Sequence, residues 1–220
     1  MRRSFTVLGL VVVGLMVVVA AHQVWAYPDM SLKTERACAT CHTNAAGGPE
    51  LTDAGTAYKS EGTVPAADDL KSPAFLGVDK CKMCHMNEYK TWAESKHATA
   101  IATLEGADAE VTAAMAKKLG IEVEGKASEA DGCLTCHVTG LKLEGGYPQA
   151  DAKKTTPVAN VGCEACHGPG AVHMKAAKAD KKTSINGNVT EVMCKGCHTP
   201  EMSPDFDYAE YSKTGIHAVK

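Results

Sequence analysis

The sequence predicts a mostly α-helical fold with extensive loops and little or no sheet. Apolar residues recur at helical spacing only in short stretches, and no alternating apolar–polar run is long enough for a real sheet. The chain also has only three Phe and two Trp among its 220 residues. These are too few for a conventional core, so another apolar group must fill the interior.

The cysteines indicate what that group is. All ten lie in five Cys-x-x-Cys-His motifs, the attachment sequence of c-type haem. Two thiols at this spacing form thioethers with the vinyl groups on one porphyrin edge, and the next residue brings an imidazole to the iron. The predicted attachment residues are Cys38, Cys41, Cys81, Cys84, Cys133, Cys136, Cys163, Cys166, Cys194 and Cys197, and the predicted proximal iron ligands are His42, His85, His137, His167 and His198. We therefore expect a multihaem cytochrome c in which short helices wrap around five closely packed, covalently attached haems.

Three other uses of paired cysteines fit less well. Structural zinc sites take four ligands, so five pairs would leave one over. A disulfide framework gives no reason for a histidine after every second cysteine. A thioredoxin-like redox motif is a single Cys-x-x-Cys rather than five scattered copies.

The N-terminal residues 1–26 resemble a secretory signal peptide. Two arginines precede a long apolar run, and small or apolar residues lead up to a cleavage site after Ala26. We therefore expect a periplasmic or secreted protein. If the segment is not cleaved, it would instead associate the chain with a membrane.

The remaining chain divides into three parts. Residues 27–62 form an N-terminal monohaem unit with one short helix near residues 51–58. Residues 63–73 contain prolines and an acidic pair, and they read as a linker. Residues 74–220 hold four haem motifs, with helices expected at about 87–104 and 108–119 and turns at 140–149 and 184–190.

The formal net charge is −3 and there is no basic patch, which argues against a nucleic-acid partner. A redox partner with a positive docking face is the natural expectation.

Outside the motifs and the signal segment, the only histidines are His97, His173 and His217. Each is a candidate distal ligand, because the residue at the sixth iron position decides between electron transfer and chemistry on small molecules. The tight turn Gly168-Pro169-Gly170 leaves His173 little reach toward the haem of His167. His173 is therefore expected to bind the iron of a neighbouring haem.

No spare histidine is left for the haem of His42. Met30 is a candidate sixth ligand there, since thioether ligation occurs in c-type cytochromes. The alternative for Met30 is simple packing.

Several segments resemble the cytochrome c-554 family of multihaem electron carriers. They are WAESKHATA (92–100), CLTCHVTGLKLEGGYP (133–148), VGCEACHGPGAVH (161–173) and CKGCHTPEMSPDFDYAEYSKTGIH (194–217). The resemblance covers about residues 74–220 and leaves the N-terminal haem unit outside the four-haem pattern.

The resemblance implies a set of ligands. It pairs His173 with the haem of Cys81 and Cys84, His97 with that of Cys163 and Cys166, and His217 with that of Cys194 and Cys197. The haem of Cys133 and Cys136 would then be five-coordinate or water-bound.

Electron transfer between redox proteins is the expected function, with an oxidoreductase or a membrane-bound quinol-linked cytochrome as partner, and the chain is not expected to be an enzyme. The alternative is a small-molecule reductase for nitric oxide, nitrite or hydroxylamine at an open haem. All five motifs end in histidine, whereas the dedicated pentahaem nitrite reductases have a lysine at the active haem. Self-association through exposed haem edges stays open.

Overall fold

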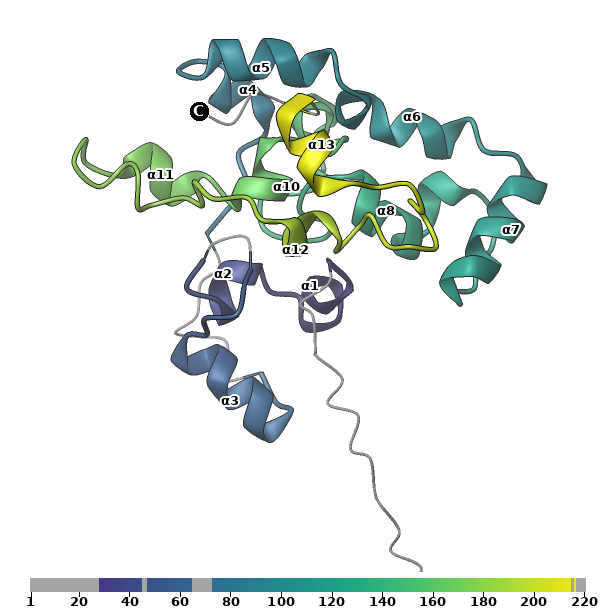
Figure 1. The fold of residues 1–220 in the computed structure, drawn as a ribbon, viewed down its shortest axis with the longest axis horizontal. Coiled ribbons are helices and arrows are strands. Elements are labelled where there is room, and N and C mark those ends of the chain that lie inside the picture. The colour runs from purple at the N-terminus through teal and green to yellow at the C-terminus, as the bar shows by residue number, and fades with distance from the viewer. Residues whose placement is uncertain (1–27, 45–46, 65–72, 215, 217–220) are drawn as a thin grey trace, which may run out of the picture.

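A computed structural model describes residues 28–44, 47–64, 73–214 and 216. Within these ranges the chain is helical and contains no strand, only an isolated bridge between His42 and Leu51 (Figure 1). The expected mostly α-helical class is confirmed. The predicted signal peptide and His217 lie outside the described residues. None of the described helices is both long and apolar enough to cross a membrane.

The described residues of the predicted N-terminal unit contain three helices: α1 (Pro28–Thr34), α2 (Cys38–Cys41) and α3 (Asp53–Glu61). The helix expected near residues 51–58 is α3. It begins at the cap residue Thr52, whose hydroxyl accepts a hydrogen bond from Gly55 N at 3.2 Å. Gly55 lets α3 pack closely on α2, because a Cβ there would lie 2.0 Å from Cys41 O.

The single helix expected over residues 87–104 is broken in the structure. It consists of α5 (Met86–Ala93), the 3₁₀ turn η2 (Lys96–Thr99) and α6 (Ala100–Glu105), and α4 (Val78–Cys81) precedes it. The break falls at Ser95, whose backbone is extended and whose hydroxyl donates to Trp92 O at 2.6 Å. Trp92 is buried and donates from Nε1 to Val161 O at 2.9 Å. This bond holds α5 against the segment just before the motif at 163–167.

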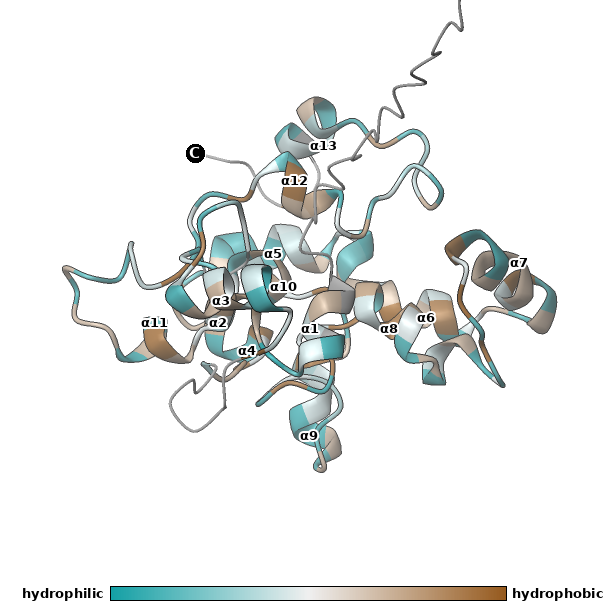
Figure 2. Cartoon of the chain, turned by 90° about the horizontal axis from the view of Figure 1, so that it is seen from below, coloured by the Kyte–Doolittle hydropathy of each residue, from teal (hydrophilic) through white to brown (hydrophobic). Residues whose placement is uncertain are grey.

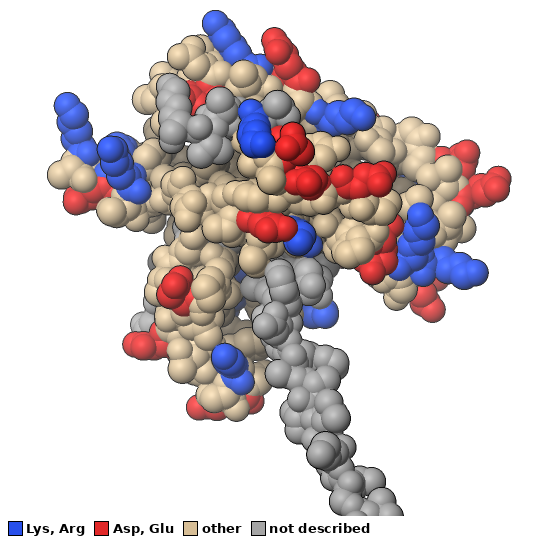
Figure 3. Space-filling model, viewed as in Figure 1, with Lys and Arg blue, Asp and Glu red and all other residues tan. Residues whose placement is uncertain are grey.

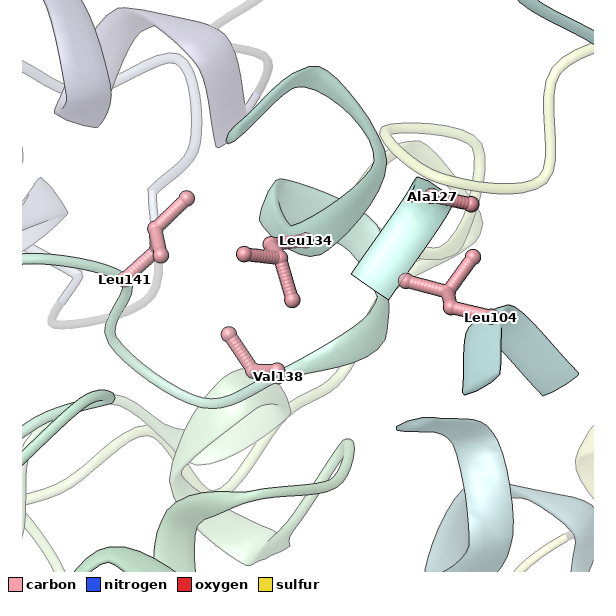
Figure 4. Close-up of a cluster of buried hydrophobic side chains, with 5 residues drawn as sticks. All are labelled: Leu104, Ala127, Leu134, Val138 and Leu141. Atoms are coloured by element: carbon pink, nitrogen blue, oxygen red, sulfur yellow. The ribbon is translucent and has the colours of Figure 1, made fainter. Parts of the chain in front are cut away.

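The helix expected over residues 108–119 is confirmed as α7 (Ala109–Leu119). Asp108 is its N-cap and accepts from Val111 N at 2.8 Å, and Gly120 ends it in the left-handed conformation. The next elements are η3 (Ala127–Glu129) and α8 (Asp131–His137). The main buried cluster lies here and is small, consisting of Leu104, Ala127, Leu134, Val138 and Leu141 (Figure 4).

Short helices and loops complete the chain. They are α9 (Ala152–Thr155), η4 (Thr156–Val158), α10 (Cys163–His167), α11 (Ala171–Lys175), α12 (Glu191–Cys194) and α13 (Tyr208–Thr214). The stretches expected as turns, 140–149 and 184–190, contain no helix.

Apolar side chains are not confined to the interior. Val172 and Met174 on α11 and Val192 on α12 are exposed, and Figure 2 shows apolar colour on both helices. On the face drawn in Figure 3, acidic and basic side chains are interspersed.

Candidate haem centres

Each Cys-x-x-Cys-His motif forms one short turn. Three of these turns lie in α2, α8 and α10, and the other two begin at the last residue of α4 and of α12. In three motifs the backbone N–H of the histidine donates to the backbone carbonyl of the first cysteine. The distances are 2.8 Å for His42 and Cys38, 2.9 Å for His85 and Cys81, and 2.9 Å for His198 and Cys194. Residues three and four apart on a helix share a face. The turn therefore brings two thiols and an imidazole to one side, as haem c attachment requires. None of the ten cysteines forms a disulfide.

The imidazoles of three motifs are oriented by a hydrogen bond at Nδ1. His137 Nδ1 lies 2.8 Å from Ala100 O, and His167 Nδ1 lies 2.6 Å from Asn186 O. A carbonyl can only accept, so Nδ1 carries the proton and Nε2 keeps its lone pair. His198 Nδ1 lies 3.0 Å from the Ser203 hydroxyl. Metal-binding histidines characteristically have this arrangement, with the second nitrogen held by a protein acceptor. The residues therefore fit an iron bound at Nε2.

His42 is different. Its Nδ1 is buried and has no hydrogen-bond partner among the described residues. A cavity of about 630 Å³ opens beside it, lined from the N-terminal unit by Ala39, His42, Thr43 and Asn44 and from the opposite side mainly by residues 182–188. Met30, the candidate sixth ligand, is half-buried in α1 and is not part of this lining.

Thiols from different motifs meet in the interior. The Cys81 and Cys163 thiols share a hydrogen bond, which raises the pKa of Cys81 and lowers that of Cys163. Cys197 shares a hydrogen bond with Cys136, and this contact together with burial raises the pKa of Cys197. Two pairs of attachment sites are thus in direct contact.

A third link joins these pairs. Burial raises the pKa of Cys166 to about 12, and the nearby Cys194 contributes to the rise. Cys166 belongs to the same motif as Cys163, and Cys194 belongs to the same motif as Cys197. The four motifs of residues 81–198 therefore form one continuous series of neighbours.

Two motif histidines face a second histidine ring. The ring centroids of His85 and His173 are 6.2 Å apart, with an angle of 35° between the planes. Nδ1 of His173 is held by Lys181 O at 3.0 Å and by the Ser184 hydroxyl at 3.2 Å. This is the neighbour that the resemblance implies for His173, and it lies in a different motif from the adjacent His167.

His97 lies against His198, with ring centroids 5.9 Å apart and planes nearly perpendicular at 87°. The resemblance implies a place for His97 at the haem of His167, so the ring that the structure brings to it belongs to a different motif. Burial lowers the pKa of His97, and the adjacent His198 lowers it further. Burial also lowers the pKa of His198. Both rings are thus held in the neutral form that binds metals.

The other three motif histidines are His42, His137 and His167. No second histidine ring lies against any of them in the part of the chain that the structure describes. The remaining candidate ligand, His217, is outside that part.

Sequence reasoning missed two buried polar residues beside the motifs. The Glu164 carboxylate accepts from Leu76 N at 3.0 Å, Gly77 N at 2.7 Å and Gly170 N at 2.6 Å. Burial raises the pKa of Glu164, and these backbone donors oppose the rise. The position of Glu164 between the two cysteines of a haem motif could have indicated that it is buried. Asn186, which holds His167, carries no such signal because it lies in a loop.

Comparison with known proteins finds relatives for the middle of the chain. The family model described as "Cytochrome c554 and c-prime" matches residues 80–168. Residues 80–168 are thus similar to the cytochrome c-554 family. Its members are multihaem cytochromes that work in electron transfer, as the resemblance of the motifs implied. The extra N-terminal unit lies outside the match.

Two curated relatives agree with the cytochrome c-554 assignment. Cytochrome c-554 of Nitrosomonas europaea is 30% identical over 126 residues, which cover 55% of this chain and 52% of the relative. The multiheme cytochrome MtrA of Shewanella baltica (strain OS185) is 32% identical over 96 residues, covering 40% of this chain and 28% of the relative. The chain thus spans about half of the first relative and less of the second.

Among solved structures, the reduced state of cytochrome c554 from Nitrosomonas europaea matches 66% of this chain and 85% of its own. The TM-score is 0.47 and the sequence identity is 24%.

Proposed function

We propose that this chain is an exported pentahaem c-type cytochrome that carries electrons between redox partners through a series of closely spaced haems. The observation that carries the proposal is the spacing of the two histidine pairs. A metal–imidazole bond is about 2 Å long, so two imidazoles on opposite sides of one ion have centroids about 6 Å apart. The centroid distances of 6.2 Å and 5.9 Å match this spacing.

The ligands follow from the pairs. We propose that His85 and His173 bind one iron and that His198 and His97 bind another, in place of the pairing of His97 with the haem of His167. His217 is then left for the haem of His167. The iron at His137 has no histidine assigned and would be five-coordinate or water-bound.

For the iron at His42, Met30 stays the predicted sixth ligand. The buried, unpartnered Nδ1 of His42 and the adjoining cavity support a haem at this motif. They do not favour one sixth ligand over another.

The thiol contacts support an order for the attachment sites. Cys81 touches Cys163, Cys166 neighbours Cys194, and Cys197 touches Cys136. The sites therefore follow one another in the order His85, His167, His198, His137. Haem c, when bound, supplies a one-electron redox centre, and the protein keeps such centres close and fixed in orientation. An unbroken series of this kind suits conduction across the molecule.

Export and partners rest on the sequence. The signal-like residues 1–26 support a periplasmic or secreted location, where redox proteins such as an oxidoreductase or a quinol-linked membrane cytochrome are the proposed donors and acceptors. A small-molecule reductase is the second candidate, and it is favoured by the lack of a second histidine ring at His137 among the described residues.

Two measurements on the purified protein test the proposal. Intact mass with a haem assay should give five covalent haems. Low-temperature EPR of the oxidised protein should show more than one low-spin haem and one high-spin haem that binds nitric oxide. Fewer haems, or a spectrum with only high-spin iron, would contradict the proposed ligands. Steady turnover of nitric oxide, nitrite or hydroxylamine would favour the reductase.

A further inference from the structure

Asn186 is a buried residue, only 6% exposed, in the loop between α11 and α12. Its backbone makes two hydrogen bonds with His167, one with the imidazole and one with the backbone carbonyl. The Asn186 carbonyl accepts from His167 Nδ1 at 2.6 Å, and the Asn186 N–H donates to His167 O at 3.1 Å. The position of Asn186 therefore sets the strength of the hydrogen bond at the proximal imidazole.

The side chain of Asn186 joins parts of the chain that are distant in sequence. Its Nδ2 donates to Cys166 O at 3.2 Å and to Met193 Sδ at 3.5 Å. Its Oδ1 accepts from Asn188 N at 2.9 Å and from Asn44 Nδ2 at 3.1 Å. Asn44 belongs to the N-terminal unit and lies two residues after His42.

This hydrogen bond is one place where the N-terminal unit meets the rest of the chain, and the contact of α1 with α8 is another. In Figure 1 the unit lies beneath α10 and α12. The cavity beside His42 is at the same junction, with Asn44 on one wall and Asn186 on the other. Because Asn186 is buried, its hydrogen bonds are little weakened by competing water.

We propose that Asn186 is a positioning residue that transmits docking of the N-terminal unit to His167 and thereby lowers the reduction potential of the iron that His167 binds. A firmly held acceptor at Nδ1 makes the imidazole a stronger electron donor, which favours the ferric state. Asn44 holds Asn186 in this position when the unit is docked. The proposal rests on the proposed function, because it needs a haem at His167.

The experiment compares Asn44→Ala with Asn188→Ala in the full-length holoprotein. Asn44→Ala removes the contact between the units but leaves Asn186 Oδ1 its bond from Asn188 N, so the loop keeps a partner and the chain is expected to fold. Asn188→Ala alters an exposed residue at the rim of the same cavity. It keeps the backbone N–H that bonds Asn186, so it is the matched control.

Redox titration followed by optical spectra and EPR gives the potential of each haem. In Asn44→Ala the reduction potential of one low-spin haem should rise by about 28 mV. For one electron this is about a threefold increase in the equilibrium constant for reduction. Asn188→Ala should match the wild type. Asn44→Gln keeps an amide donor and should restore most of the wild-type potential.

Unchanged potentials in Asn44→Ala, or an equal shift in Asn188→Ala, would overturn the proposal. Failure of the proposed function itself would be visible separately, since the wild type would then have fewer than five haems or no low-spin signal at all.

Discussion

The imidazoles of His97 and His198 face each other at 5.9 Å with their planes nearly perpendicular, whereas those of His85 and His173 are inclined by only 35°. The angle between two axial imidazoles has a spectroscopic consequence. Perpendicular planes leave two iron d orbitals nearly equal in energy, so orbital angular momentum persists and the largest g value is high. Nearly parallel planes separate these orbitals and give a less anisotropic signal. The two proposed pairs can thus be told apart by EPR.

Replacing His97 by alanine should abolish the highly anisotropic low-spin signal and produce a new high-spin haem. The reason is that the iron at His198 loses its proposed sixth ligand. Low-temperature EPR of the oxidised protein is the measurement, with the exposed neighbour Lys96→Ala as control. Survival of the anisotropic signal in His97→Ala would show that His97 does not bind the iron at His198.

Replacing His173 by alanine should instead remove the less anisotropic signal and leave the one assigned to His97 and His198. The iron at His85 would then be open and should bind added nitric oxide. The two histidine variants are controls for each other. If both variants lost the same signal, the proposed pairing would be wrong.

Replacing Gly55 by alanine should damage only the N-terminal unit. The new Cβ would meet Cys41 O at 2.0 Å, and overpacking of this kind costs at least about 1–3 kcal/mol. Because Cys41 is an attachment residue, we expect the haem of His42 to be lost in part while the other four remain. Intact mass would show a population with four haems. Thr56→Ala, at an exposed position on the same helix, should keep five. Loss of several haems in Gly55→Ala would mean that the unit does not fold independently.

Replacing Glu164 by glutamine should lower the free energy of unfolding by about 1–3 kcal/mol, the range for a buried donor left without an acceptor. A glutamine amide offers one oxygen where the carboxylate offers two, and three backbone N–H groups converge there. Denaturant unfolding followed by haem absorption is the measurement. Glu94→Gln, at the exposed C-terminal end of α5, should have little effect.

Comparing wild type with Glu164→Gln at several pH values tests whether burial or the backbone donors have the larger effect on the pKa of Glu164. Burial raises its folded-state pKa above the usual 4.5, so the folded chain binds this proton more tightly than the unfolded chain. The stability that Glu164 contributes is then fully present below pH 4.5 and falls as the pH rises through the folded value. The advantage of wild type over Glu164→Gln should therefore shrink as the pH rises above 4.5. An advantage that grows would mean that the backbone donors outweigh burial.

The sequence predicted those features that depend on local pattern. Five motifs with fixed spacing place thiols and imidazole on one helical turn, and that turn needs no distant contact. The same holds for α7, whose ends are marked by Asp108 and Gly120. The apolar periodicity predicted one unbroken helix over residues 87–104. The helix breaks at Ser95, whose hydroxyl bonds to Trp92 O, and the spacing of apolar residues does not indicate this bond.

The site was only partly predictable for a related reason. The sequence supplied the spare histidines His97 and His173, but which iron each can reach depends on how the motifs pack. His97 lies on the 3₁₀ turn after the break at Ser95, beside a motif that begins almost a hundred residues later. Asn186 and Asn44 lie in loops, and nothing in the sequence indicates that they contact each other. The 3.1 Å hydrogen bond between them is visible only in the structure.

The thiol contacts also bear on how the chain matures. Cys81 touches Cys163 and Cys136 touches Cys197, so a chain that folded before its haems were attached would hold reactive thiols from different motifs side by side. In an oxidising compartment such pairs would form disulfides between motifs, each removing two attachment sites at once. The haems would therefore have to be attached before the chain folds. The order of these two events, rather than the stability of the finished protein, would then set the yield of the complete cytochrome.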